Sequence, residues 1–233
     1  RRYAVVQFEQ LRARLPFVTD DVKRDFRRCL EGAEFIIDYN EDNTSMSCYD
    51  GLQDKVHFVP FGVSPCMYYP VCLRDAIKHP PVIFFGNIYG LRQKWLSEIT
   101  SHIRSSEIKV YSNCLWNSTT PPYCADKMVA VMSSKICLCI PAAENANLET
   151  VRINYMVCNG VLVISHRVNG WQEYDGLVIF VDDAADMARI IKMCLQNEAF
   201  RKSWVEQAQQ LLQLKYNYSE HLSLINEKYL SVT

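Results

Sequence analysis

The feature that most constrains this chain is a repeated alternation of short apolar segments with stretches of helical length. The first apolar segments are Tyr3–Phe8, Phe35–Ile37 and Val56–Val59, and a helical stretch near Asp20–Gly32 separates the first two. Alternation of this kind indicates βαβ units, in which consecutive strands pair in parallel. The sequence therefore predicts an α/β fold that is built on parallel sheets.

A proline-bearing segment, Ser64–Pro81, interrupts this alternation, and we expect it to be the hinge between two lobes. The lobes are expected to span residues 1–72 and 73–233, with the last helix packing back on the first lobe. In the second lobe the predicted strands are Val82–Phe85, Ile108–Tyr111, Ile136–Ile140, Val161–Ser165 and Leu177–Val181. The predicted helices are Arg92–Ile103, Tyr123–Ser133, Glu149–Cys158, Ala184–Leu195 and Ala199–Leu230.

Doubly wound sheets bind their ligands beyond the carboxyl ends of the strands. This rule directs attention to the residues that follow each predicted strand. They are Glu9, Asp38, Gly62, Gly86, the segment after Ile140, and the pair Ser165-His166.

Charge and cysteine content narrow the class of protein. The formal net charge is -1, so no overall basic field attracts nucleic acid or anionic lipid. No apolar run approaches the roughly 20 residues that span a bilayer. The ten cysteines include no CxxC pair, and Cys137 and Cys139 lie within an apolar run, as free buried thiols do. We therefore expect a reducing, cytoplasmic location. The chain begins directly at Arg1-Arg2, and we expect it to be part of a longer protein.

Five segments in a fixed order resemble glycosyltransferases of the GT-B type. They are Val56–Val63, Phe84–Arg92, Ser134–Leu138, Leu148–Ser165 and Gly170–Tyr174. The second lobe is similar to the donor-binding lobe of glycosyltransferase families 1 and 4. The first lobe resembles a shortened form of the acceptor-side lobe found in bacterial and large-DNA-virus glycosyltransferases of this type. The resemblance implies two Rossmann-like lobes with parallel sheets, the N-terminal one truncated.

The resemblance assigns donor-binding roles to Gly86, Asn87, Arg92, Glu149 and Arg152. A glycine after a strand lets the backbone approach a diphosphate, and an arginine pairs with phosphate oxygens. Glu149 would accept the ribose hydroxyls. Each assignment has a plainer alternative. Gly86 and Asn87 would form a simple turn with Arg92 in solvent, and Glu149 would be a helix-start carboxylate paired i,i+3 with Arg152. One departure is Tyr155, which stands where typical members have the second of two glutamates.

The remaining candidates are single residues. Lys135 and His166 are predicted to contact the donor, and Glu9 to be the catalytic base of an inverting transfer, with Asp38 as the competing carboxylate. Either carboxylate would alternatively cap a helix. Loop residues that would hold sugar or base are Asn145, Asn147, Trp171 and Glu173.

The expected partners are a UDP-sugar donor and a glycan acceptor. A deoxyhexose such as rhamnose is one candidate for the transferred sugar. No Asp-x-Asp triplet is present, and Asp182-Asp183 opens a helix, so we expect metal-independent transfer without a cofactor. A non-catalytic lobe that binds sugar nucleotides or glycans is the main alternative, and an interaction scaffold is another. The missing GxGxxG after the first strand argues against a dinucleotide enzyme.

Overall fold

The computed structural model describes residues 3–7, 11, 18–64, 67–68, 80–111, 133–144, 146–217, 219–220, 222–223 and 227. The chain forms two compact units. One comprises residues 1–62 and 218–233, and the other residues 63–217.

The described part of the first unit contains a three-stranded parallel sheet in the order β1-β2-β3. Its strands are β1 (Val5–Gln7), β2 (Ile36–Asp38) and β3 (Val56–Phe58). The helix α2 (Asp20–Gly32) lies between β1 and β2, and short 3-10 helices lead from β2 to β3: η2 (Glu41–Ser45), η3 (Ser47–Tyr49) and η4 (Gln53–Lys55). The predicted strands and helix of this region are confirmed.

The second unit is larger, and its described residues form a parallel sheet of five strands in the order β5-β4-β6-β7-β8. The strands are β4 (Val82–Phe85), β5 (Ile108–Tyr111), β6 (Ile136–Cys139), β7 (Leu162–His166) and β8 (Ile179–Val181). The connecting helices are α3 (Leu91–His102), α5 (Thr150–Cys158), η7 (Trp171–Tyr174), α6 (Ala184–Gln196) and α7 (Glu198–Lys215). Each predicted strand of this lobe is confirmed to within two residues at either end.

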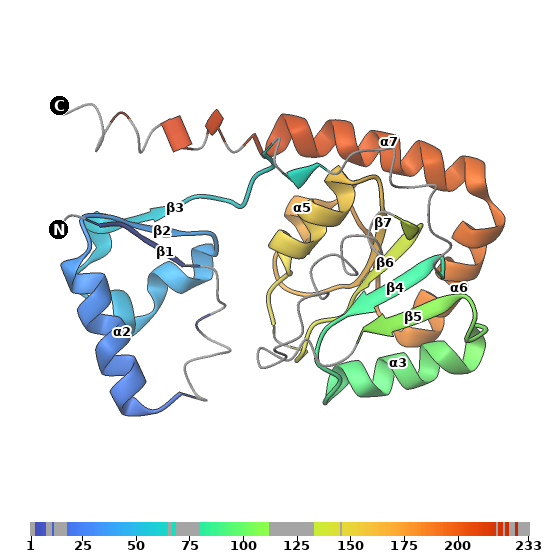
Figure 1. Cartoon of the computed structure of the whole chain (residues 1–233), viewed down its shortest axis with the longest axis horizontal. Helices are drawn as coiled ribbons and strands as arrows, with labels where there is room; N and C mark the ends of the chain where they lie inside the picture. The colour runs from blue at the N-terminus through green and yellow to red at the C-terminus, as the bar shows by residue number, and fades with distance from the viewer. Residues whose placement is uncertain are drawn as a thin grey trace. The chain divides into compact units, whose positions relative to one another are not determined.

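Helices cover both faces of this sheet, which explains why its inner strands β4 and β6 read as unbroken apolar runs. Along β4, Val82 and Phe84 pack with α3 and α6, whereas Ile83 and Phe85 pack with α5 and α7. Figure 1 shows α3 on one side of the sheet and α5 with α7 on the other. The sheet is therefore the middle layer of a three-layer unit.

The predicted C-terminal helical stretch is interrupted after Lys215. The sequence predicts a mostly helical stretch from Ala199 to Leu230. In the structure α7 ends at Lys215, and the described residues 219–220, 222–223 and 227 are again helical. The backbone carbonyl of Tyr216 accepts a 2.8 Å hydrogen bond from the Val63 amide, and Asn217 pairs with Val63 as a parallel bridge. This tertiary pairing takes the backbone out of the helix. The predicted helix 123–133 falls almost wholly outside the described residues.

In the described part of the chain, none of the helices combines the length and apolarity that crossing a membrane requires.

Candidate functional site

The candidate site lies at the carboxyl edge of the second unit's sheet. The neighbouring strands β4, β6 and β7 end there, at Phe85, Cys139 and His166. All three run in parallel, so the loops that follow them begin at the same edge. In open α/β sheets this edge is where ligands bind.

Gly86 begins the loop after β4 and makes room for the side chain of Arg92. Its φ of +147° is one that a side chain disfavours, and an added Cβ would lie 3.1 Å from Nη1 of Arg92. The Arg92 side chain is buried, and its Nε donates to the carbonyl of Ile140 at 2.7 Å. The loop after β4 and the end of β6 thus fix this guanidinium over the sheet edge.

Glu149, from the loop between β6 and α5, is held between two arginines. Nη2 of Arg92 lies 2.6 Å from Oε1 of Glu149, and Nη1 of Arg152 lies 2.5 Å from Oε2. The thiol of Cys139 donates to Oε2 at 3.5 Å. Burial and the Glu149 charge raise the pKa of the Cys139 thiol far above its ordinary value, so this cysteine stays protonated. We call Arg92, Glu149 and Arg152 the arginine–glutamate cluster.

The two helices that start beside this cluster lack side-chain caps. The N-cap residues are Gly90 for α3 and Glu149 for α5, and neither makes a side-chain cap hydrogen bond. Each helix carries one arginine of the cluster and no acidic residue in its first turn. By contrast, α6 and α7 are capped by the side chains of Asp183 and Asn197. Uncapped amides and guanidinium groups together favour an anion at this edge.

His166, at the end of β7, lies on the α3 side of the same edge. Its ring lies against Trp95, tilted by 45° with centroids 4.5 Å apart, and the buried Nδ1 has no hydrogen-bond partner among the described residues. Burial lowers the pKa of His166, while the charges of Asp182 and Glu144 oppose this shift. The imidazole is therefore neutral at physiological pH.

Two other predicted donor residues are placed differently. Asn87 is exposed and follows Gly86 in the loop after β4. Lys135 precedes β6, and its amide donates to the carbonyl of Pro81, the residue before β4. It therefore lies at the amino edge of the sheet, and the structure does not bring it to the cluster.

The two predicted catalytic carboxylates belong to the first unit. Asp38 ends β2, is fully buried and accepts hydrogen bonds from the Tyr49 hydroxyl at 2.6 Å, the Asn40 amide at 2.9 Å and the Asn43 amide group at 3.1 Å. Burial raises the pKa of Asp38, and these three hydrogen bonds oppose the shift. The carboxylate thus organises the segment after β2. Glu9 lies outside the described residues.

The predicted loop residues are bound to neighbouring segments. Asn147 pairs with Asn169 as a parallel bridge. The Trp171 ring lies under the guanidinium of Arg167, 4.4 Å from its centroid, and the Glu173 carbonyl accepts from the hydroxyl of Tyr216 at 3.3 Å. Asn145 lies outside the described residues.

Sequence reasoning missed three groups that shape the site. They are the Ile140 carbonyl that anchors Arg92, the Cys139 thiol that donates to Glu149, and the Trp95 ring that contacts His166. The signal for Trp95 was its spacing, because it lies three residues after Arg92 and so shares its face of α3. A backbone carbonyl leaves no such signal.

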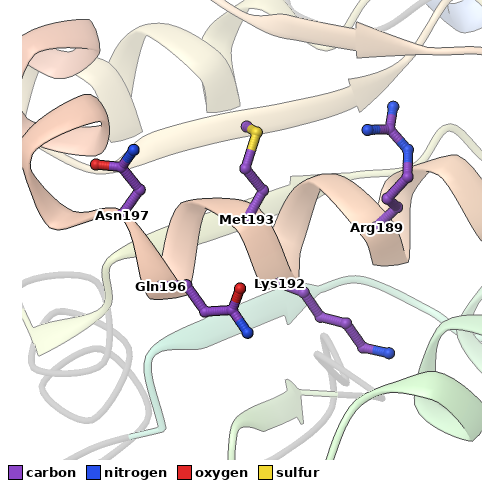
Figure 2. A pocket seen from close by; sticks show the side chains of 5 residues that line it. All are labelled: Arg189, Lys192, Met193, Gln196 and Asn197. Carbon is purple, nitrogen blue, oxygen red and sulfur yellow. The ribbon is translucent and has the colours of Figure 1, made fainter.

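One surface hollow lies away from this edge. Its volume is about 570 Å³. It is lined by Arg189, Lys192, Met193 and Gln196 of α6 and by Asn197, the residue directly after that helix (Figure 2). Because α6 starts after the carboxyl end of β8 and runs back along the sheet, this hollow lies toward the amino edge. Among the described residues, no three His, Cys, Asp or Glu side chains gather to hold a metal ion.

Comparison with known proteins agrees with this architecture. The sequence profile of a family described as glycosyl transferase-like matches residues 90–226. No curated protein matches the sequence.

Two solved structures share the fold. HepE from Anabaena, in complex with UDP-glucose, has a TM-score of 0.66 at 10% identity, covering 100% of this chain and 73% of HepE. A TarM mutant from S. aureus, solved with fondaparinux, α-GlcNAc-glycerol and UDP, has a TM-score of 0.55 at 13% identity, covering 99% of this chain and 50% of TarM. At such identities the likeness concerns the fold alone, and it confirms the predicted GT-B-like α/β class.

Proposed function

Because the chain belongs to the glycosyl transferase-like family, we propose that it transfers a sugar from a nucleoside diphosphate sugar to a glycan acceptor. A UDP-sugar is the favoured donor, since HepE was solved with UDP-glucose and TarM with UDP. A deoxyhexose such as rhamnose is the finer proposal for the sugar.

The observation that carries the proposal is the arginine–glutamate cluster at the carboxyl edge of the sheet. Two guanidinium groups and two uncapped helix starts converge there, and a diphosphate offers the matching charge and oxygen acceptors. In this proposal Arg92 and Arg152 bind the phosphates, Gly86 and Asn87 line them, and His166 contacts the donor at the neighbouring strand end.

The proposed chemistry uses no metal. A leaving diphosphate gains negative charge as the bond to the sugar breaks, and fixed guanidinium groups stabilise that charge without reorganising. Arg92 suits this role because its Nε is anchored on the Ile140 carbonyl. The acceptor hydroxyl would lose its proton to Glu9, with Asp38 as the competing carboxylate.

The test is titration calorimetry of the full chain with UDP, GDP and TDP at millimolar concentration, followed by an assay of sugar release from UDP-sugars. We expect UDP to bind and a UDP-sugar to be hydrolysed slowly in the absence of acceptor. Failure of all three nucleotides to bind would remove the proposal.

The second candidate is a lobe that binds sugar nucleotides without turnover. Tyr155 favours it, because a tyrosine stands where the resemblance places a donor-site glutamate. The two candidates differ in the hydrolysis assay, since a non-catalytic lobe would bind UDP-sugars and leave them intact.

A further inference from the structure

Glu149 is itself an anion bound where the donor phosphates are proposed to bind. Both of its carboxylate oxygens are occupied, Oε1 by Arg92 at 2.6 Å and Oε2 by Arg152 at 2.5 Å. The ribose role implied by the family resemblance would need these oxygens to be available as acceptors. In this structure they serve the arginines instead.

The position of Glu149 on α5 sharpens this point. It is the N-cap residue, where a side chain ordinarily accepts a hydrogen bond from an amide of the first turn, yet its carboxylate makes no cap hydrogen bond. It bridges the two guanidinium groups instead. The carboxylate therefore neutralises the arginines rather than the helix start.

The members of the cluster differ in how firmly they are held. The Arg92 side chain is 8% exposed and is anchored on Ile140, whereas the Glu149 side chain is 21% exposed and the Arg152 side chain 23% exposed. Arg92 is thus the fixed element. Glu149 is the N-cap residue of α5, its side chain is partly exposed, and it also accepts from the Cys139 thiol at 3.5 Å.

We propose that Glu149 is a placeholder for the donor diphosphate. In the free protein it neutralises and orients Arg92 and Arg152. When a diphosphate arrives, its oxygens take over both guanidinium groups and the carboxylate swings away. This inference rests on the proposed donor site, and it makes Glu149 a competitor that lowers the affinity for the donor.

The test compares wild type with Glu149→Gln, which keeps the shape of the side chain and removes its charge. The amide lacks the Coulomb attraction that a carboxylate has for the two guanidinium groups, so it competes less well for them. We expect the affinities for UDP and for inorganic pyrophosphate to rise in parallel, by about tenfold each. Calorimetry measures both, and pyrophosphate reports on the phosphate site without a ribose.

Glu198→Gln is the matched control. Glu198 also lies between two cations, Lys202 at 2.9 Å and Arg201 at 3.9 Å, but it starts α7 away from the carboxyl edge of the sheet. This variant should leave both affinities unchanged. If Glu149→Gln does not fold, Glu149→Asp replaces it, because the shorter carboxylate no longer reaches both arginines and should also tighten both ligands.

The possible results separate the proposals. Weaker UDP binding with unchanged pyrophosphate binding would mean that Glu149 holds the ribose, and weaker binding of both ligands would make it a brace for the arginines. Either result overturns the placeholder while leaving the donor site in place. If neither ligand binds to wild type or to the variants, the donor site and the proposed function fail together.

Discussion

Arg92 and Glu149 lie 57 positions apart in the chain, and their side chains meet at 2.6 Å above the carboxyl edge of the sheet. The contact joins two segments of the chain. Arg92 lies in the first turn of α3, and Glu149 ends the segment between β6 and α5. It also depends on the Ile140 carbonyl, which accepts from Arg92 Nε and fixes the guanidinium plane.

The first prediction concerns this guanidinium. Arg92→Lys keeps the charge but cannot donate to Ile140 and an anion together, since lysine is a point charge without the planar fork. Losing one charged hydrogen bond costs about 1.5–3 kcal/mol, so UDP affinity should fall by roughly one to two decades. Calorimetry with UDP measures this. Arg189→Lys is the control, because Arg189 is exposed on α6 and paired with Asp186; equal effects of the two variants would contradict the assignment.

A second prediction concerns Gly86. Gly86→Ala places a methyl group 3.1 Å from Nη1 of Arg92, at a φ of +147° that alanine disfavours. We expect a stability loss of about 1–3 kcal/mol together with weaker UDP binding. Gly51→Ala separates the two effects, because Gly51 also has a positive φ, of 73°, but has no atom within 4 Å of the added Cβ. Gly51→Ala should lower the free energy of unfolding, measured with urea, and leave the UDP affinity unchanged. If Gly86→Ala also left the UDP affinity unchanged, the result would contradict the proposed site.

The sequence was sufficient to predict the layers of the second unit for a specific reason. Parallel strands that are covered on both faces, such as Ile136–Cys139 with all four residues buried, read as unbroken apolar runs. The pairing of Glu149 with Arg152 was also predictable, because helical spacing places i and i+3 side by side.

Other features depend on tertiary contacts that leave no local pattern. The helical stretch after Ala199 gives no sign that Tyr216 will leave the helix to bond Val63. The distance between Arg92 and Glu149 follows from the strand order, which has no local pattern in the sequence. Lys135 differs, because it precedes the predicted strand Ile136–Ile140, and that position already indicated the amino edge. The ring contact between His166 and Trp95 likewise joins segments that the sequence alone does not connect.

The third prediction separates the two carboxylates of the first unit. Glu9→Gln should lower turnover by about 10²–10⁴ and leave UDP affinity unchanged, as the loss of a general base does. Asp38→Asn should instead lower the free energy of unfolding by about 1–3 kcal/mol, because the buried carboxylate is the acceptor for Tyr49, Asn40 and Asn43. Tyr49→Phe should reproduce that stability loss. A normal turnover in Glu9→Gln with a large loss in Asp38→Asn would transfer the role of base to Asp38.

The fourth prediction concerns metal ions. Transfer activity should survive EDTA largely intact, because the proposed site sets Arg92 and Arg152 where a cation would otherwise neutralise the diphosphate. Activity is measured with and without chelator, with manganese added back in a third sample. Complete loss in EDTA that manganese restores would contradict the proposed chemistry.

The last prediction follows from the lowered pKa of His166. Burial against Trp95 disfavours the protonated ring more than the charges of Asp182 and Glu144 favour it, so the folded-state pKa lies below the ordinary value of about 6.5. A group of this kind contributes stability that is present above the unfolded-state pKa and is lost as the pH falls through the folded-state pKa. The melting temperature of wild type should therefore fall more steeply between about pH 7 and pH 5 than that of His166→Gln, because glutamine takes up no proton in this range. His102→Gln is the control, since His102 is exposed at the end of α3 and should keep the wild-type slope. Equal slopes in wild type and His166→Gln would show that protonation of this ring is not linked to folding.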